Sequence, residues 1–389
     1  MLKRASKKRL TRPDYNALAL ALHKKLGGKL EVISKRRLKT KTDWSTMYTP
    51  GVGAVSSYVA KHPKSAREYT MKKNSVAVVS DGSAVLGLGN IGPLAALPVM
   101  EGKCAIFKEM AGIDGVPIVL ATQDPDEIVE TVRRIAPTFG AINLEDIKAP
   151  YCFEVEERLK KELDIPVMHD DQHGTAIVVL AGLINAAKVV EKNIKKMKVA
   201  IIGAGAAGRA IALLLVSYGV KDVVVVDSQG IISTKRKGLV SYKKELATLT
   251  NPQNVVGDAT TAIAGRDVVV GVSGPGTLTQ AHVASMAEKP IVFALANPVP
   301  EILPDEARRA GAYVVATGRS DFPNQVNNAL VYPGIFRGAL DRNVPAITEP
   351  MKRAAAEAVA ALVMHPTRTE IIPKVTTRGL VAAVAKVIR

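Results

Sequence analysis

The chain has 389 residues, of which 47% are hydrophobic and 23% charged, and it carries a formal net charge of +17. This length can bury a large core in two or three domains, and no apolar run approaches the roughly 20 residues that span a bilayer, so we expect a cytoplasmic globular protein without a membrane partner. The basic balance favours anionic partners, but with 4% aromatic residues and no helix-turn-helix or zinc-finger pattern we expect no specific nucleic-acid partner.

The first half of the sequence alternates short apolar segments with helical patterns. A helix is predicted over about 14–26, and helical spacing resumes near 53–61 after a loop rich in turn residues. The predicted strands of this half are short and apolar, at 75–82, 104–110, 117–122 and 165–170. Helical patterns over 124–136 and 150–163 lie between strands. This alternation predicts an α/β fold.

The second half begins a clearer β-α-β pattern. The segment "KVAIIGAGAAGRAIALLLVSYG" (198–219) predicts a strand, a glycine turn and a helix, and "DVVVVD" (222–227) predicts the next parallel strand. Further strands are predicted at 267–273, 290–297 and 312–317, before helices around 349–364 and 378–388. We therefore expect two domains: an N-terminal α/β catalytic domain over 1–171, and a Rossmann-type doubly wound parallel sheet over 172–389 whose C-terminal helices pack back across the cleft.

Two glycine motifs match G-x-G-x-x-G, and their contexts differ. The match at 203–208 ends a predicted strand, opens a helix without proline, and is followed by Asp227 at the end of the next strand. This context predicts a dinucleotide-binding loop whose pyrophosphate lies at the helix N-terminus. Its expected contacts are Gly203, Ala204, Gly205, Ala206, Ala207, Gly208 and Asp227. The match at 87–92 is followed by proline, and it either lines a substrate pocket or is a tight turn.

Acidic residues follow an apolar segment and a predicted strand. Glu145 and Asp146 lie in "INLEDIKAP" (142–150), and Asp171 lies in "HDDQHGT" (169–175). Carboxylates at the C-terminal ends of two strands can converge on one crevice, and hard oxygen ligands suit Mg²⁺ or Mn²⁺. The competing interpretation is that all three residues cap the helices expected to start near 149 and 173.

Ordered motifs along nearly the whole chain resemble the malic enzymes, specifically the short prokaryotic type. These motifs are "YTPGVG" (48–53), "SDGSAVLGLGNIG" (80–92), "PVMEGKCAIFKEMAGIDGVPI" (98–118), "INLEDIKAP", "HDDQHGT", "GAGAAG" (203–208), "ALANPVP" (294–300) and "PNQVNNALVYPGIFRGAL" (323–340). The resemblance implies oxidative decarboxylation of L-malate to pyruvate and CO₂, with NAD or NADP, with Mg²⁺ or Mn²⁺, and in a homodimer.

The same resemblance implies roles for individual residues. Glu145, Asp146 and Asp171 would be the metal ligands, and Tyr48 and Lys103 the acid-base pair. As a base, Lys103 would need a pKa well below its usual range, and we expect burial and the nearby cation to lower it. Asn297 and Asn328 would contact the substrate or the nicotinamide ribose.

Two points of the resemblance leave alternatives open. Larger members of the family hold malate with an arginine at the position of Ala84, so a different residue must bind the substrate carboxylate here. Asp227 favours NAD, because a carboxylate repels a 2'-phosphate, yet the cations at 235–237 could reach one. Both cofactors therefore remain possible.

Three other functions compete with this interpretation. A malolactic-type enzyme would use the same metal and cofactor but produce lactate. An amino-acid dehydrogenase would not need the three carboxylates. In a different class, the charge of +17 could mark a nucleic-acid-associated protein with a vestigial dinucleotide fold.

Overall fold

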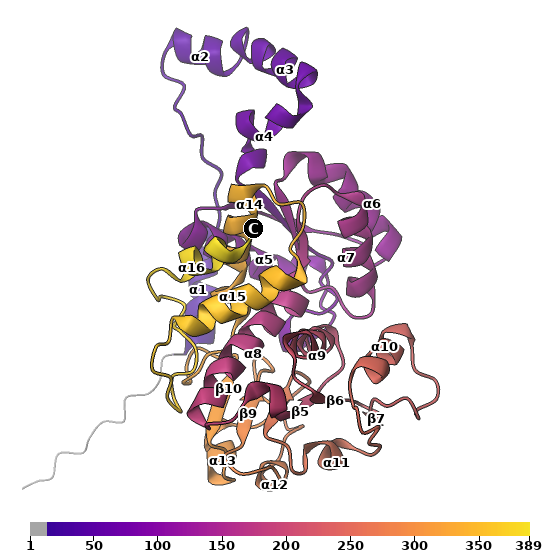
Figure 1. Cartoon of the computed structure of the whole chain (residues 1–389). Coiled ribbons are helices and arrows are strands. Elements are labelled where there is room, and N and C mark those ends of the chain that lie inside the picture. The colour runs from indigo at the N-terminus through magenta and orange to yellow at the C-terminus, as the bar shows by residue number, and fades with distance from the viewer. Residues whose placement is uncertain (1–13) are drawn as a thin grey trace, which may run out of the picture.

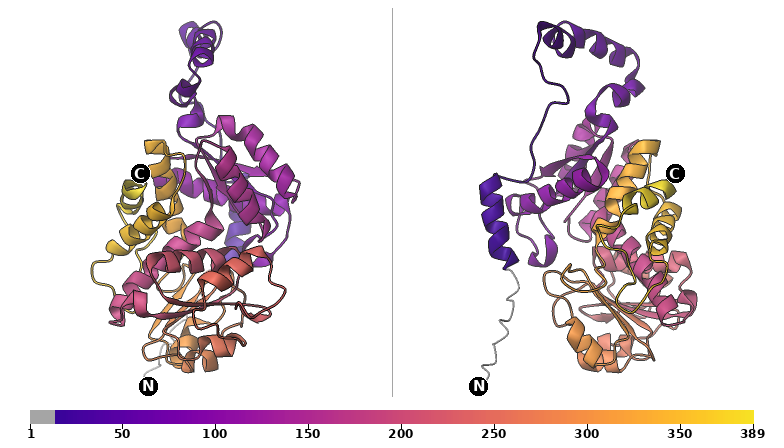
Figure 2. Two further views of the ribbon diagram at one scale, coloured as in Figure 1. Left: turned by 45° about the vertical axis from the view of Figure 1, so that its right-hand side comes forward. Right: turned by 90° about the vertical axis from the view of Figure 1, so that its left-hand side faces the viewer.

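The computed structural model describes residues 14–389 and contains one parallel and one mainly parallel sheet, each covered by helices on both faces (Figures 1 and 2). The first sheet has the order β2-β1-β3-β4. Its strands are β1 (Ser75–Ser80), β2 (Asp114–Val119), β3 (Ala141–Leu144) and β4 (Val167–His169). The second sheet has the order β10-β9-β8-β5-β6-β7, with β7 antiparallel to β6. Its strands are β5 (Lys198–Ile202), β6 (Asp222–Asp227), β7 (Gly230–Ile231), β8 (Val268–Gly271), β9 (Ile291–Ala294) and β10 (Val314–Thr317). The predicted α/β class is confirmed.

The helices follow the strand-helix alternation expected from the sequence. In the first half they are α1 (Tyr15–Leu26), α2 (Lys41–Met47), α3 (Gly51–Lys61), α4 (Ala66–Tyr69), α5 (Pro93–Ala111), α6 (Pro125–Ile135), α7 (Tyr151–Glu162) and α8 (Asp170–Val189). The later helices are α9 (Ala206–Tyr218), α10 (Ser241–Leu249), α11 (Ala259–Ile263), α12 (Gln280–Ala284), α13 (Pro304–Arg309), α14 (Tyr332–Arg342), α15 (Glu349–Ala361) and α16 (Leu380–Val387).

Side chains of the first sheet alternate between two apolar layers. Val76 and Val78 point into the layer formed with α5, α8 and α14, whereas Ala77 and Val79 pack with α6 and α7. Since both faces are covered, the strands are mostly apolar and do not alternate with polar residues in the sequence. The second sheet is built in the same way, with α8, α9 and α15 on one face and α11–α13 on the other.

The strand predicted over 104–110 is wrong, because this segment belongs to α5. Gly92 precedes Pro93 at the first helical position, and Gly112 ends the helix with a left-handed backbone. The buried positions of α5 recur at helical spacing, at Ala96, Met100, Lys103, Cys104 and Phe107. A short apolar window cannot distinguish a strand from one face of a buried helix, and only the longer pattern does.

Helix α14, which follows the second sheet in sequence, packs on α5 of the first half. The ring centroid of Phe107 lies 4.8 Å from that of Tyr332 and 5.3 Å from that of Phe336, and all three rings are fully buried. Edge-on aromatic contacts of this kind add to the stabilisation from buried area. The two halves are therefore joined by a shared core as well as by the chain.

Replacing Phe107 with alanine is expected to lower the free energy of unfolding by about 3–5 kcal/mol, because it leaves a cavity at this junction. The measurement is the urea midpoint of unfolding. A matched control on the same helix is Leu94→Ala, whose side chain is 83% exposed and whose loss should change little. Equal midpoints for the two variants would contradict the role assigned to Phe107.

Helices α2 and α3 form an arm that projects away from the body, as both views in Figure 2 show. Large apolar side chains on this arm are exposed, namely Trp44, Met47, Tyr48, Val52, Val55 and Tyr58. No residue of α3 is buried. Separately, none of the helices within residues 14–389 is long and apolar enough to cross a membrane.

Candidate active site

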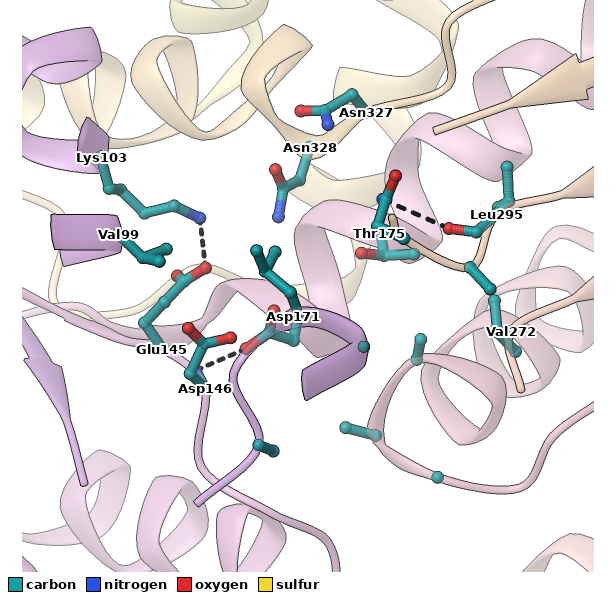
Figure 3. Close-up of a pocket in the computed structure, with 18 of the residues that line it drawn as sticks. Val99, Lys103, Glu145, Asp146, Asp171, Thr175, Val272, Leu295, Asn327 and Asn328 are labelled. Atoms are coloured by element: carbon teal, nitrogen blue, oxygen red, sulfur yellow. Dashed lines mark hydrogen bonds and ion pairs between the residues drawn. The ribbon is translucent and has the colours of Figure 1, made fainter. Parts of the chain in front are cut away.

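A cavity of about 900 Å³ lies between the two halves of the molecule. It is lined from the first half by Lys103, Glu145, Asp146 and Asp171, and from the second half by the glycine loop after β5 and by Asn297 and Asn328. Figure 3 shows the lysine and the three carboxylates gathered on one side, with Asn328 directed toward them. The cavity thus brings together segments that are far apart in the sequence.

The register of the first sheet brings the carboxylates together. Val79 pairs with Leu144, and Leu144 pairs with His169, so the residues that follow β3 and β4 leave the sheet at the same edge. Glu145 and Asp146 follow β3, and Asp171 lies in the first turn of α8. One oxygen from each of these three carboxylates lies within 4.8 Å of the others.

Asp146 is the most constrained member of this cluster. Its backbone is left-handed, with φ at 54°, which costs of order 1–3 kcal/mol for a residue other than glycine. Its amide donates to Oδ2 of Asp171 over 2.8 Å, and its carbonyl accepts from the amide of Ala84 over 2.9 Å. These contacts hold the Asp146 side chain beside Glu145, and its Oδ2 is buried without a hydrogen-bond partner among residues 14–389.

The alternative that these residues cap helices is wrong. Helix α7 starts at Tyr151 after Pro150, and α8 starts at Asp170 after His169, and neither helix has a side-chain cap. Asp171 is the second residue of α8, so its carboxylate is free to face the cavity. Helix capping therefore does not explain why these three carboxylates lie together.

Burial and mutual repulsion both disfavour three negative charges in this cluster. Burial, and to a lesser extent the carboxylate of Asp171, raises the pKa of Asp146 to about 8. Burial likewise raises the pKa of Glu145 well above its usual range, although Lys103 opposes the shift. A divalent cation relieves both effects and prefers hard oxygen ligands. The orphaned oxygen of Asp146 and the three converging carboxylates fit Mg²⁺ or Mn²⁺.

Lys103 reaches the cluster from the buried face of α5. Its Nζ lies 2.5 Å from Oε1 of Glu145, 2.5 Å from Oδ2 of Asp170 and 4.4 Å from the ring centroid of Tyr332. Burial disfavours the ammonium, but the carboxylates of Asp170 and Glu145 outweigh it, and the pKa of Lys103 lies well above its usual range. The lowered pKa expected from the sequence is therefore not found in this arrangement.

Sequence reasoning passed over Asp170 and Tyr332. Asp170 is fully buried and pairs with Lys103, while its neighbour Asp171 lies with Glu145 and Asp146 in the carboxylate cluster. Successive helical residues point in directions about 100° apart, so adjacent carboxylates on α8 serve different partners. The run "HDDQHGT" contains both carboxylates. That they point in different directions follows only once α8 is known to start at Asp170.

The glycine loop after β5 has the shape that a dinucleotide needs. A Cβ on Gly203 would meet the Val272 carbonyl oxygen at 2.5 Å, and one on Gly208 would meet the Gly203 carbonyl oxygen at 1.8 Å, so both positions require glycine. A Cβ on Gly205 would meet nothing within 4 Å, which leaves the backbone open to the cavity. Gly205 immediately precedes α9, whose N-terminus suits a pyrophosphate. The loop fits the cofactor predicted from it.

Comparison with protein families divides the chain into two matched segments. Residues 27–160 match the family model for the malic enzyme N-terminal domain, and residues 172–388 match the model for the malic enzyme NAD binding domain. The chain belongs to the malic enzyme family. The function of this family is oxidative decarboxylation of malate with NAD or NADP, as the sequence predicted.

Individual malic enzymes are similar over most of the chain. The NAD-dependent malic enzyme of Geobacillus stearothermophilus is 53% identical over 93% of this chain and 76% of its own length. The bifunctional malic/malolactic enzyme of Bacillus subtilis is 54% identical over 95% of this chain and 91% of its own length. The crystal structure of the NAD-dependent malic enzyme from Thermotoga maritima superposes with a TM-score of 0.92, at 46% identity, over 95% of this chain and 98% of that one.

The structure does not bring Tyr48, the expected acid of a malic enzyme, to Lys103 of the same chain. Tyr48 lies at the end of α2 on the projecting arm, and its side chain is 64% exposed. It is absent from the lining of the cavity. Asn297 and Asn328 do line the cavity, and the contacts expected of them with the substrate or the nicotinamide ribose stay a prediction.

Basic side chains also line this cavity. Ala84 lines the cavity, and so do Lys29 and Lys148. Nζ of Lys29 donates to the carbonyl oxygen of Pro98 over 2.6 Å and keeps two hydrogens for another acceptor. Gly87 of the first glycine motif lies against the backbone of Asn297, where a Cβ would meet the Asn297 carbonyl oxygen at 2.0 Å. That motif is therefore part of the cavity wall.

Proposed function

We propose that this cavity carries out the malic enzyme reaction, with Glu145, Asp146 and Asp171 holding Mg²⁺ or Mn²⁺ and with Lys103 as the general base. The observation that carries the proposal is the convergence of three carboxylates beside a buried lysine, across one cavity from a glycine loop. In this arrangement residues 1–171 bind the metal and malate, and residues 172–389 bind the dinucleotide. The proposed boundary between these two segments, after Asp171, lies in the first turn of α8.

The chemistry follows from the residues around malate. A divalent cation held here would polarise the C2 hydroxyl of malate and stabilise the negative charge that develops on that oxygen as CO₂ leaves. Lys103 removes the hydroxyl proton while a hydride passes from C2 to the nicotinamide. Asp170, already in contact with Nζ of Lys103, orients the amine and can take up its proton. Asn297 and Asn328 orient the substrate and the nicotinamide ribose.

Lys103 must lose its proton before it can act as a base. Glu145 and Asp170 are the carboxylates that most favour its ammonium form. A cation held by Glu145 would offset one of these two charges and would move the pKa of Lys103 downward. Metal binding would then favour proton removal by Lys103.

We further propose that the protein is a homodimer and that Tyr48 acts in the cavity of the partner chain. Support comes from the arm α2–α3, whose exposed apolar side chains are numerous enough to cover a second surface. The enol product of decarboxylation needs a proton at carbon, and Tyr48 is the residue that the family resemblance assigns to this step. The cytoplasmic location expected from the sequence stays a prediction.

Purified full-length protein with L-malate, Mn²⁺ and either NAD or NADP is expected to form reduced nicotinamide and an equal amount of pyruvate. EDTA should stop both, because the metal is needed to activate the hydroxyl. The measurement is nicotinamide absorbance together with assays for pyruvate and lactate. Lactate without net nicotinamide reduction would support the malolactic reaction instead, and turnover that resists EDTA would contradict the metal site.

A further inference from the structure

The turn that carries Asp170 and Asp171 has no side-chain cap of its own. Helix α8 starts directly after His169, and its first turn holds both carboxylates. Asp170 contacts Nζ of Lys103, and Asp171 belongs to the carboxylate cluster. Both side chains face their partners only while this turn keeps one position relative to β3 and α5. A contact from elsewhere in the fold can therefore control the two carboxylates together.

Glu156, a buried carboxylate on α7, makes this contact. Its Oε1 accepts from the backbone amide of His169 over 2.9 Å. Its Oε2 accepts from Nε2 of His173 over 2.9 Å and from Nε2 of Gln172 over 3.3 Å. These three donors stand immediately before and immediately after the two acidic residues of the turn. One side chain of α7 thus holds the start of α8 on both sides of its carboxylates.

The contact depends on the charge of Glu156 as well as on its volume. Nζ of Lys160, one turn further along α7, lies 2.7 Å from Oε1, so four donors face this carboxylate. A carboxylate offers about four acceptor sites, whereas a protonated carboxyl or an amide would turn a hydrogen toward one of the donors. A negative charge at the N-terminus of α8 also interacts favourably with the helix dipole.

His173 connects this contact to the C-terminal helices. Its Nδ1 lies 2.9 Å from Nζ of Lys352 on α15, and the same Nζ donates to Oε1 of Glu349 over 2.5 Å. An ammonium can only donate, so Nδ1 accepts, and the proton of the neutral ring is assigned to Nε2. The contact with Lys352 therefore fixes the tautomer in which His173 donates to Glu156.

We propose that Glu156 is a positioning residue of the active site, which acts through the first turn of α8 to hold Asp170 and Asp171 in place. This inference rests on the proposed role of Asp171 as a metal ligand. Glu156 does not line the cavity, so it acts through the turn and not on a bound ligand. Outer contacts that orient metal ligands typically change metal affinity by about 10–100-fold when they are removed.

The test is Mn²⁺ binding to the full-length protein without malate or cofactor, followed by electron paramagnetic resonance. Glu156→Gln keeps the volume of the side chain but not its charge, and it is expected to weaken Mn²⁺ binding about 10-fold. Hydrogen exchange of the metal-free protein should become faster over 168–175, because the amide of His169 loses its acceptor. The second readout involves neither metal nor turnover.

Two neighbours on α7 provide matched controls. Val155 is fully buried against the first sheet, so Val155→Ala should lower the urea midpoint of unfolding but leave Mn²⁺ affinity within about 2-fold. Glu157→Gln removes the same charge from a side chain that is 69% exposed and should change neither quantity. Equal losses of Mn²⁺ affinity in Val155→Ala and Glu156→Gln would show that Glu156 only stabilises the fold.

Two variants of His173 give an independent test if Glu156→Gln does not fold. The amide nitrogen of glutamine can take the place of Nε2 and donate to Glu156, so His173→Gln should keep Mn²⁺ affinity within about 3-fold. Asparagine is too short to reach Glu156, so His173→Asn should bind Mn²⁺ more weakly than His173→Gln. Equal affinities of these two variants would then contradict the proposal.

Asp171→Ala separates this inference from the proposed metal site. If Asp171→Ala binds Mn²⁺ as tightly as the wild type, the metal site is wrong and the inference fails with it. If Asp171→Ala loses affinity while Glu156→Gln stays within about 2-fold of the wild type, the metal site stands and the positioning role of Glu156 alone is overturned.

Discussion

Replacing Asp171 with alanine is expected to lower the rate of malate oxidation at least about 1000-fold, because metal assistance contributes several kcal/mol and each tenfold step in rate corresponds to about 1.4 kcal/mol. The side chain of Asp171 lines the cavity and is 32% exposed, so its removal leaves the buried core in place and the fold should be retained. The affinity for Mn²⁺, followed by electron paramagnetic resonance, should fall in parallel. Activity and metal affinity are thus predicted to be lost together.

A surface carboxylate provides the matched control for this variant. Asp126 pairs with Arg158 on the outer helices α6 and α7, and its side chain is 82% exposed. Asp126→Ala should leave both Mn²⁺ affinity and turnover close to those of the wild type. If Asp171→Ala kept wild-type activity with unchanged metal dependence, Asp171 would not be a metal ligand.

Mixing two inactive variants, Tyr48→Phe and Lys103→Met, is expected to restore about a quarter of wild-type activity if the protein is a homodimer that exchanges its arms. Each mixed dimer then has one cavity with Lys103 from one chain and Tyr48 from the other, and a second cavity that lacks both groups. Random association makes about half of the dimers mixed, and half of their sites work. The measurement is pyruvate formation after co-refolding or co-expression.

The same mixture distinguishes exchange from an arm that serves its own chain. If Tyr48 acted within its own chain, every cavity of a mixed dimer would carry one defect, and no activity would return. Differently tagged chains confirm that mixed dimers have formed before the assay. Tyr48→Phe should remain dimeric in sizing experiments, since it removes only a hydroxyl; a monomer would instead assign Tyr48 to assembly.

Local sequence patterns were sufficient for most of the elements. Strands buried on both faces appear as apolar runs, and β1, β4, β5 and β6 lie where those runs predict. The segment 104–110 was predicted as a strand because its seven residues include several apolar side chains in a short window, although they belong to α5. Helix α14 was missed because its segment contains proline and two glycines, and its burial depends on packing against α5.

The sequence by itself determined the groups that must follow a strand directly: the glycine loop after β5, the carboxylates after β3 and β4, and Asp227 after β6. Their positions depend on chain-local geometry, because parallel strands end at a common edge. Tertiary structure alone decided which partner each charge has. Lys103 faces Asp170 as well as Glu145, Asp227 is held by two cations, and Tyr48 lies on an exposed arm. These outcomes depend on contacts between segments distant in the chain, which no local pattern records.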